Sequence, residues 1–375
     1  MPDQHLHVIA FNVPHPADYG GVIDIYYKLK SLKQEGVKII LHCYTYGRQP
    51  SKELEDLCAE VHYYKRDSGF FYALHRDPYI VTTRNSNIMP KRILRDNYPI
   101  LFEGLHSTSR LVHYAQAGKK CLVRAHNIEH YYYQALSRSE NRLYDKIFLY
   151  TEAIKLRHYE KVLGYADHIL GISRPETDYF LEKYGHSSLI HAFHRFDEIT
   201  IKPGLGDYIL FHGNLAVAEN SDVFLRIAGN VLSKISHRVL VAGKNPSKSF
   251  IRKLSAWSNI SVIANPSDKE MDGLIADAQV NLLYTAQSTG IKLKLLHALF
   301  GGRHCLVNSE MIGGTGLESL CQLAEEPKDM TDQLEELMKR PFIEQQVIER
   351  ESALKEYSNK AGAKKILALL GTIQY

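Results

Sequence analysis

The sequence predicts an α/β protein of two domains, each built on a parallel sheet that helices cover. Short apolar runs alternate with longer helical patterns along the whole chain, which is typical of such sheets. The alternation pauses at the charged segment 197–206, which holds Pro203 and two glycines, and then restarts. The 375 residues also amount to about two and a half typical single domains.

The first domain is expected over residues 1–200. Its expected strands and extended segments are the apolar runs Leu6–Val13, Val37–Cys43, Val61–Tyr64, Ile100–Glu103, Lys120–Ala125, His168–Ser173 and Ser188–His194. The helical patterns between them begin at Gly21, Ser51, Arg142 and Arg174.

The second domain is expected over residues 201–350. Its expected strands are Tyr208–His212, Arg238–Ala242, Ile260–Ala264, Asn281–Tyr284 and His304–Asn308. Its helical runs begin near Asn220, Ser247, Asp268 and Gly290. The doubling is architectural, because the chain contains no short-period repeat.

The composition is that of a globular protein. Hydrophobic residues make up 45% of the chain and charged residues 23%, which excludes disordered and collagen-like classes. A formal net charge of +4 is too small to favour nucleic acid as a partner. The five cysteines have no CxxC spacing, so they indicate a reducing compartment rather than disulfides or structural zinc. With neither a signal-peptide pattern nor a membrane-spanning apolar run, the protein is expected to be cytoplasmic.

Charge is unevenly distributed along the chain. Residues 62–95 hold seven Lys or Arg and two acidic residues, whereas residues 318–352 hold ten acidic and four basic residues. A solvated face is the simpler interpretation of each run. The basic run could instead contact an acidic acceptor or an anionic membrane surface, which leaves peripheral membrane contact open.

The strongest chemical signal is segment 287–302, which follows a predicted strand and leads into a helix. Backbone N–H groups and the positive end of the helix dipole should gather at its first turn and favour an anion. The residues of this turn are Thr289, Gly290, Ile291 and Lys292. Beyond it, only Lys294 and His297 interrupt an apolar helix, and a bound diphosphate would give Lys294 a partner. In the alternative, Lys294 pairs with a structural carboxylate and Gly290 only makes a turn.

Two further segments follow predicted strands of the first domain. Gly20 and Gly21 lie at a strand-to-helix turn, where glycine lets a ligand approach, although a tight turn alone explains them more simply. Arg124, His126 and Glu129 follow a later strand, at an edge where α/β proteins place ligand contacts. A polar cluster without function is the alternative for these three residues.

Segment 126–130 also matches the HxxEH pattern of inverted zinc peptidases. That pattern requires both histidines on one helix and a further ligand, whereas His126 is expected at a strand end. Zinc hydrolysis is therefore disfavoured, and no metal site is expected.

The predicted helix that begins near Arg142 carries apolar residues at 4, 3, 4 spacing, beside several basic residues. These apolar residues are Leu143, Ile147, Tyr150 and Ile154. Core packing with a basic outer face explains the pattern, and membrane docking is the alternative.

Taken together, these segments resemble the GT-B glycosyltransferases, and their family 4 group in particular. Pro14–Gly21 is similar to the N-terminal Gly-Gly loop of that group, and Arg124–Tyr133 to its loop after a middle strand. Residues 211–220 are similar to the opening of its C-terminal domain, and residues 289–308 to its donor helix and the strand that follows. The resemblance covers most of the chain in the right order, although no single motif is diagnostic.

The resemblance implies two Rossmann-like domains whose parallel sheets face each other across a central cleft. The acceptor would bind residues 1–200 and the nucleotide-sugar residues 201–350. Residues 351–375 would form a C-terminal helix that crosses back to the first domain.

The resemblance also implies roles for individual residues. His126, which matches a histidine that contacts the donor sugar, and Lys294, which matches the basic position of the donor helix, would be catalytic. The residues at the donor diphosphate would be Gly20, Gly21, Thr289, Gly290, Ile291, Lys292 and Lys294. The contacts to the donor sugar or acceptor would be Arg124, His126, Glu129 and His297. The loop that opens the second domain would contribute Gly213, Asn214 and Lys244.

The chain departs from the group in two respects. Relatives carry two glutamates eight residues apart, and the equivalent positions are Thr289 and His297. The Arg and Lys usual after the first strand of the second domain are not evident in residues 212–220, so Lys244 or Lys292 could supply one of these charges.

The function implied by the resemblance is transfer of a sugar, of the hexosyl type, from a nucleotide diphospho-sugar to a glycan or lipid-linked acceptor. Surface polysaccharide biosynthesis and retention of configuration are expected. In retaining members the leaving diphosphate helps to deprotonate the acceptor, so no metal or cofactor is expected. The missing glutamates leave two alternatives, a non-catalytic GT-B partner of an active transferase and a GT-B sugar-nucleotide epimerase. Any membrane contact would be peripheral, at the inner face of the plasma membrane.

Overall fold

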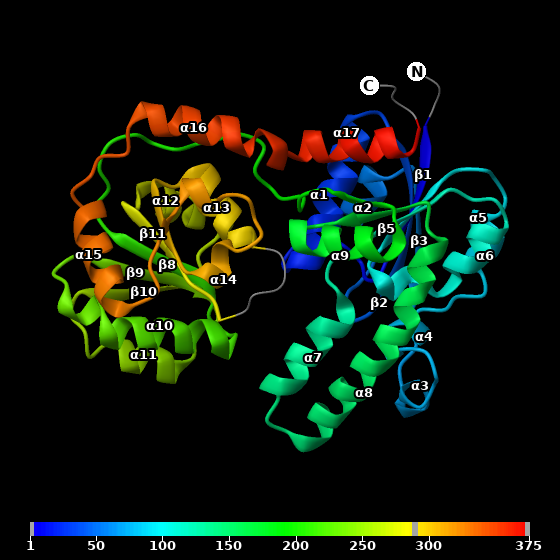
Figure 1. Cartoon of the computed structure of the whole chain (residues 1–375), viewed down its shortest axis with the longest axis horizontal. Helices are drawn as coiled ribbons and strands as arrows, with labels where there is room; N and C mark the ends of the chain where they lie inside the picture. The colour runs from blue at the N-terminus through cyan, green and yellow to red at the C-terminus, as the bar shows by residue number, and fades with distance from the viewer. Residues whose placement is uncertain (1–3, 287–291, 372–375) are drawn as a thin grey trace. The chain divides into compact units, whose positions relative to one another are not determined.

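The computed structural model describes residues 4–286 and 292–371 and divides into two compact units (Figure 1). The first unit comprises Met1–Arg195 and Glu356–Tyr375, and the second comprises Phe196–Lys355. The C-terminal segment therefore belongs to the first unit. Within the described residues, no helix is both long enough and apolar enough to cross a lipid bilayer.

The first unit is built on a parallel sheet of seven strands in the order β3-β2-β1-β4-β5-β6-β7. The strands are β1 (His5–Ala10), β2 (Lys38–Thr45), β3 (Glu60–Lys65), β4 (Ile100–Glu103), β5 (Cys121–Arg124), β6 (His168–Gly171) and β7 (Ser187–Leu189). Because the strand order reverses between β1 and β4, their carboxyl ends flank the position where such sheets bind ligands.

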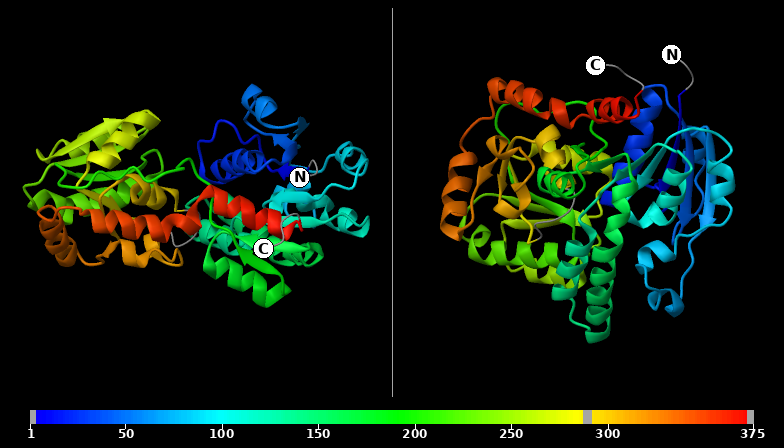
Figure 2. Two further views of the ribbon diagram at one scale, coloured as in Figure 1. Left: turned by 90° about the horizontal axis from the view of Figure 1, so that it is seen from above. Right: turned by 45° about the vertical axis from the view of Figure 1, so that its right-hand side comes forward.

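Helices cover both faces of this sheet. The α-helices are α1 (Gly20–Gln34), α2 (Lys52–Leu57), α3 (Phe70–Ala73), α4 (Tyr79–Thr82), α5 (Met89–Ile93), α6 (Leu111–Gln116), α7 (Glu129–Ser139), α8 (Leu143–Tyr159), α9 (Arg174–Tyr184) and α17 (Asn359–Leu369), and the 3₁₀ turns are η1 (Leu105–Arg110), η2 (Glu160–Tyr165) and η5 (Lys355–Tyr357). Local chemistry sets the ends of α9: a capping box of Ser173 and Glu176 starts the helix, and Gly185, at φ +80°, ends it. In the core, α17 packs against α1 (Figure 2).

The second unit repeats this architecture with six parallel strands in the order β10-β9-β8-β11-β12-β13. The strands are β8 (Ile209–Asn214), β9 (Val239–Lys244), β10 (Ile260–Ala264), β11 (Val280–Leu283), β12 (His304–Val307) and β13 (Gln322–Leu323). The helices and 3₁₀ turns are α10 (Ala218–Asn230), η3 (Leu232–Lys234), α11 (Lys248–Leu254), α12 (Asp268–Asp277), α13 (Leu293–Gly301), α14 (Ser309–Ile312), η4 (Glu318–Leu320), α15 (Pro327–Leu337) and α16 (Glu344–Leu354). The order reverses between β8 and β11, so this sheet has its own ligand position.

The expected strands all form, with shifts at their ends. The segment expected over Ser188–His194 is a strand only over Ser187–Leu189, and β13 was not expected. The stretch after β5 was interpreted as a loop as far as Tyr133, but α7 begins within it, at Glu129.

The prediction that the apolar stripe on α8 packs in the core is wrong. Leu143, Ile147, Tyr150 and Ile154 are all exposed. The buried residues of α8 lie on another side of the helix and are Glu152, Ala153 and Leu156. Because α7 packs against α8, the two helices form a hairpin that projects from the sheet (Figures 1 and 2). The stripe remains exposed on this hairpin.

The chain contains 19 histidines and 24 tyrosines, and some of them have a structural role. His7 Nδ1 lies 3.0 Å from His42 Nε2, and His42 Nδ1 lies 2.8 Å from the Tyr64 hydroxyl. These side chains bridge β1, β2 and β3 inside the unit. Burial lowers the pKa of both histidines, so they act as neutral hydrogen-bonding groups in the core.

Candidate functional site

A buried ionic cluster lies beneath the carboxyl edge of the first sheet. Lys28 of α1 places its Nζ 2.8 Å from Asp24 Oδ2 and 2.8 Å from both carboxylate oxygens of Glu103, at the end of β4. Arg124, at the end of β5, places Nη2 2.9 Å from Asp24 Oδ1. All four side chains are fully buried. Two cations balance two carboxylates, so the cluster can be buried without net charge.

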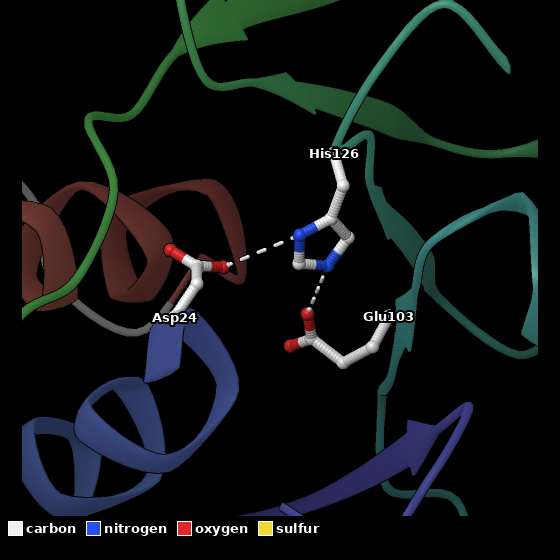
Figure 3. Close-up of side chains that lie close together, drawn as sticks. All are labelled: Asp24, Glu103 and His126. Carbon is white, nitrogen blue, oxygen red and sulfur yellow. Dashed lines mark hydrogen bonds and ion pairs between the residues drawn. The ribbon is translucent and has the colours of Figure 1, made fainter. Parts of the chain in front are cut away.

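His126 joins this cluster to the surface of the site. Its Nε2 lies 3.2 Å from Glu103 Oε2, and its Nδ1 lies 3.9 Å from Asp24 Oδ2 (Figure 3). Burial raises the pKa of both carboxyls, but the charges of Lys28 and, for Asp24, also Arg124 outweigh it and lower both pKa values. Glu103 is therefore an ionised acceptor that can orient the His126 ring.

Asp24, Glu103 and His126 also have the ligand chemistry of a metal site, with one atom from each within 4.8 Å of the others. The Lys28 ammonium already lies between the two carboxylates and donates to both. A metal ion there would add charge beside a buried ammonium, so these residues do not fit one.

A second group of buried polar atoms adjoins His126. The atoms without a hydrogen-bond partner among the described residues include His106 Nδ1, His126 Nδ1, Asn127 Oδ1 and Glu129 Oε1. Glu129 Oε1 lies 4.0 Å from His106 Nδ1. Buried polar atoms normally have partners, so this group, the orphan cluster, is suited to receive a polar ligand.

The electrostatics of the orphan cluster favour neutral groups. Burial raises the pKa of Glu129 to about 7. Burial, and then the charge of nearby Arg84, lowers the pKa of His106 well below its usual value. Glu129 can therefore donate or accept a proton near neutral pH, while His106 stays neutral.

Two glycines shape the walls of this cluster. A Cβ on Gly104 would lie 2.9 Å from His106 Nδ1 and 3.5 Å from His126 Cδ2. A Cβ on Gly21 would lie 2.9 Å from Phe11 Cζ, and the Phe11 ring packs against both His106 and His126. Gly21 thus has a packing role here; Gly20 is the first residue of α1.

Gly104→Ala is expected to displace His106 and impair the orphan cluster. Gly104 has φ +73° and ψ 162°, a combination that is essentially restricted to glycine, so alanine also costs about 1–3 kcal/mol of backbone strain. Gly118→Ala is the matched control, because Gly118 has φ +78° and no atom within 4 Å of an added Cβ. Urea unfolding should show a loss of stability in both variants, larger in Gly104→Ala because its Cβ also meets His106, and activity should fall only in Gly104→Ala. Equal activity in the two variants would contradict the placement of His106 at a functional site.

In the second unit, Lys294 lies at the carboxyl edge of the sheet, in the first turn of α13. Its Nζ donates to the Tyr284 carbonyl at 2.8 Å and lies 5.8 Å from the centre of the Phe211 ring. Burial lowers the pKa of Lys294 to about 8, against the opposing charge of Glu219. Among the described residues, Lys294 forms no salt bridge, so the predicted pairing with a structural carboxylate is not observed.

His297 lies one turn further along α13 and has protein partners. Its Nε2 lies 2.6 Å from Asp272 Oδ1, and its ring stacks on Phe196 at 4.5 Å. The ring of the buried His212, within β8, lies 5.9 Å from the His297 ring and leaves its Nε2 without a partner among the described residues. His297 is thus held by a carboxylate, and His212 is the nearby ring with an open nitrogen.

The other predicted residues of the second unit lie along the same edge of its sheet. Gly213 and Asn214 end β8, and Lys244 ends β9 beside Asn214 with an exposed side chain. Lys292 precedes α13. Thr289, Gly290 and Ile291 lie outside the described residues.

Several site residues were not expected from the sequence. They are Asp24, Lys28, Arg84, Glu103 and His106. A signal existed for some of them: Glu103 and Arg124 are charged residues that end apolar strands, and Asp24 and Lys28 are four apart on a helix. Arg84 donates to the backbone carbonyls of Phe11 and Ile80, which no local pattern indicates.

Comparisons with known proteins agree with this architecture. No protein-family model matches the chain. A Klebsiella pneumoniae protein, described as an uncharacterized 44.6 kDa protein in the cps region, is 27% identical over 344 residues, which cover 82% of this chain and 84% of that protein.

Solved structures match over nearly the whole chain. TarM matches with a TM-score of 0.67 and 10% identity, covering 98% of each chain. A glycosyltransferase from Rickettsia africae matches with a TM-score of 0.64 and 15% identity, also over 98% of each chain. Anabaena HepE in complex with UDP and glucose matches with a TM-score of 0.65 and 9% identity, over 98% of this chain and 100% of that chain. The chain has the GT-B fold, as the sequence resemblance implied.

Proposed function

We propose that this protein is a glycosyltransferase that moves a sugar from a nucleotide diphospho-sugar to a glycan or lipid-linked acceptor. The carrying observation is the partly buried Lys294 ammonium at the switch point of the second sheet, in a chain with the GT-B fold. The HepE structures with UDP and UDP-glucose support a nucleotide-sugar donor. The cps-region relative supports surface polysaccharide biosynthesis, and we place the protein in the cytoplasm, at the inner face of the plasma membrane.

The donor diphosphate is proposed to bind at Lys294. The first turn of α13 offers backbone N–H groups and a positive dipole end, and Lys294 projects from that turn. A partly desolvated ammonium without a counter-charge is unfavourable, and a bound diphosphate would supply that counter-charge. Lys292 and the exposed Lys244 are the further cations proposed at this edge.

The orphan cluster is proposed to bind a hydroxyl group of the acceptor or of the transferred hexosyl group. A sugar hydroxyl both donates and accepts, so it can satisfy His106 Nδ1, His126 Nδ1 and Glu129 Oε1, which are open. In the retaining reaction, the bond from the sugar C1 to the diphosphate breaks and the bond from C1 to the acceptor oxygen forms on the same face. The acceptor proton goes to a diphosphate oxygen, and cations stabilise the developing charge, so this proposal requires no metal or cofactor.

Turnover of nucleotide-sugars tests this function. The full chain is incubated with a panel of nucleotide-sugars and released nucleoside diphosphate is measured. We expect one donor to raise the melting temperature and to be slowly hydrolysed. The proposal fails if a folded protein shows neither effect with any donor.

Glu129→Gln tests the proposed role of the orphan cluster. We expect kcat/KM for the acceptor reaction or for donor hydrolysis to fall about 10- to 100-fold, because a hydrogen bond from an ionisable group is worth about 1.5–3 kcal/mol. Nucleotide diphosphate binding should stay unchanged, since Lys294 is intact. Asp145→Asn, which changes a partly exposed carboxyl of α8, is the control. Unchanged kcat/KM in Glu129→Gln would remove Glu129 from the site.

The same variant should change stability in a pH-dependent way. The folded-state pKa of Glu129, about 7, lies above the ordinary glutamate value of 4.5, so the folded protein binds more protons between these pH values. The contribution of Glu129 is therefore full below about pH 4.5 and is lost as pH rises through 7. Glu129→Gln should be more stable than the wild type at pH 8 and equally stable at pH 4.5, by urea unfolding. Equal stability at both pH values would contradict the raised pKa.

A non-catalytic GT-B partner is the second candidate, favoured by one observation. His297 stands where relatives have a glutamate, and Asp272 and Phe196 hold it. Donor turnover by the isolated protein would exclude this candidate. Conversion of the donor into an epimer without acceptor would indicate the epimerase alternative instead.

A further inference from the structure

The exposed stripe on α8 is unusual for a helix of a globular unit. Its members are Leu143, Tyr144, Ile147, Tyr150 and Ile154, each between 46% and 71% exposed. At 100° per residue, Leu143, Ile147, Tyr150 and Ile154 fall within about 60° of one another, and buried Glu152 lies on the opposite side. Thus α8 presents an apolar face of which about half or more is exposed.

A second exposed apolar group lies beside this stripe. Phe70, Phe71 and Leu74 of α3 and its C-cap form the α3 tip, in which Phe71 is 85% exposed. A hydrogen bond holds the tip to α8: Lys155 Nζ donates to the Ala73 carbonyl at 2.6 Å. The α3 tip and the α8 stripe therefore belong to one surface of the first unit, and α3 lies next to α8 in Figure 1.

The start of α4 is held to the same helix. Glu152 Oε2 accepts from the Tyr79 backbone N–H at 2.6 Å, and the Tyr79 ring packs edge-on against Phe148 at 5.9 Å. The C-terminal end of the α3 tip and the start of α4 are thus both held to α8.

The charges around this surface are mostly positive. The exposed charged residues from 138 to 161 are all basic and comprise Arg138, Arg142, Lys146, Arg157 and Lys161. The acidic residues of that stretch are partly or fully buried; Glu152 pairs with Lys155 and Glu160 with Lys183. The surface that surrounds the apolar stripe therefore attracts anions.

A groove of about 840 Å³ lies between α8 and the segment that follows the α3 tip. Its lining residues are His75, Arg76, Asp77, Ile154, Lys155, His158 and Tyr159. Lys155 is already paired with Glu152 there, which leaves Arg76 and two imidazoles opposite Asp77, beside an apolar stripe residue. The groove suits a phosphate group whose attached chain is apolar.

We propose that the α8 stripe, the α3 tip and this groove dock the protein onto an anionic phospholipid bilayer. The apolar side chains enter the boundary between headgroups and acyl chains, and the basic residues meet lipid phosphates. A two-fold dimer through the same surface is disfavoured, because it would bring the basic residues of one copy against those of the other.

The biological reason for docking rests on the proposed function, since a lipid-linked acceptor would lie at the bilayer surface. The docking itself requires neither donor nor acceptor. Vesicle binding and nucleotide diphosphate binding are therefore measured separately on the same protein samples. Failure of docking leaves nucleotide binding intact, and failure of the transferase proposal leaves vesicle binding intact.

Flotation of the full chain with lipid vesicles tests the inference. One vesicle set contains phosphatidylcholine alone and the other also contains phosphatidylglycerol. We expect the wild type to float with the anionic set only. Arg157→Glu should lose flotation at high salt, and Ile147→Ser should partition onto the vesicles about 10-fold more weakly. Ile348→Ser is the matched control: Ile348 of α16 is 56% exposed and Ile147 is 55% exposed. Because both side chains are exposed, neither substitution should affect folding, which circular dichroism checks.

Two results would overturn the inference. The first is a wild-type protein that does not float with anionic vesicles, or an Ile147→Ser variant that floats as well as the wild type. The second is a wild-type dimer in analytical ultracentrifugation that Ile147→Ser converts into monomers, without vesicle binding by either protein. That second result would assign the surface to another copy of this chain.

Discussion

Lys28→Met is expected to lower the free energy of unfolding by about 3–5 kcal/mol, the usual cost of removing one partner from a buried ion pair. The Lys28 ammonium is the closest cation to both oxygens of Glu103, at 2.8 Å, and it also binds Asp24. Without it, the fully buried Glu103 keeps only His126 as a hydrogen-bonding partner among these side chains. Urea unfolding of the variant and the wild type measures the difference.

Lys30→Met is the matched control for this prediction. Lys30 lies on the same helix, but its side chain is exposed. Substitutions at such positions usually change stability by less than about 0.5 kcal/mol. If Lys28→Met and Lys30→Met unfold at the same urea concentration, the ionic cluster does not organise the site as described.

Lys294→Met is expected to weaken nucleotide diphosphate binding about 10- to 100-fold, since a charge-assisted hydrogen bond contributes about 1.5–3 kcal/mol. The variant should remain folded, because position 294 is only partly buried and the lysine's hydrogen-bond partner in the protein is a backbone carbonyl. Calorimetric titration gives the affinity, and circular dichroism monitors the fold. Lys253→Met, at an exposed position of α11, is the control.

The pH dependence provides a second readout for Lys294. Its pKa in the free protein is lowered to about 8, so the ammonium form, which attracts a diphosphate, decreases as pH rises through 8. Wild-type affinity should therefore fall between pH 7 and pH 9, whereas the affinity of Lys294→Met should not. A parallel decline in both proteins would place the titrating group elsewhere.

The fold could be predicted because parallel strands buried on both faces appear as short apolar runs, and helices appear as longer periodic ones. That alternation located every strand of the two sheets except β13. It did not reveal whether the apolar stripe of α8 is covered, because periodicity shows that a helix has an apolar face and not what packs on it. Leu143 and Ile147 are consequently exposed rather than part of the core.

The site could be predicted only in part. His126 and Lys294 were found because each follows a strand or begins a helix within a recognisable segment. The ionic cluster was missed because its members are far apart in sequence: Lys28 is 75 residues from Glu103, and Asp24 is 100 residues from Arg124. The sheet topology brings them together, since β1 and β4 are neighbours, as are β4 and β5. Glu129 was expected in a loop, but it is the first residue of α7.

The central claim is that the second unit binds a nucleoside diphosphate at Lys294. Calorimetric titration of the full chain with nucleoside diphosphates of each base tests it most directly. The account predicts saturable one-to-one binding of at least one of them, weakened about 10- to 100-fold by Lys294→Met and unchanged in Lys253→Met. A folded wild-type protein that binds none of these diphosphates, or binds one equally well after Lys294→Met, would contradict it.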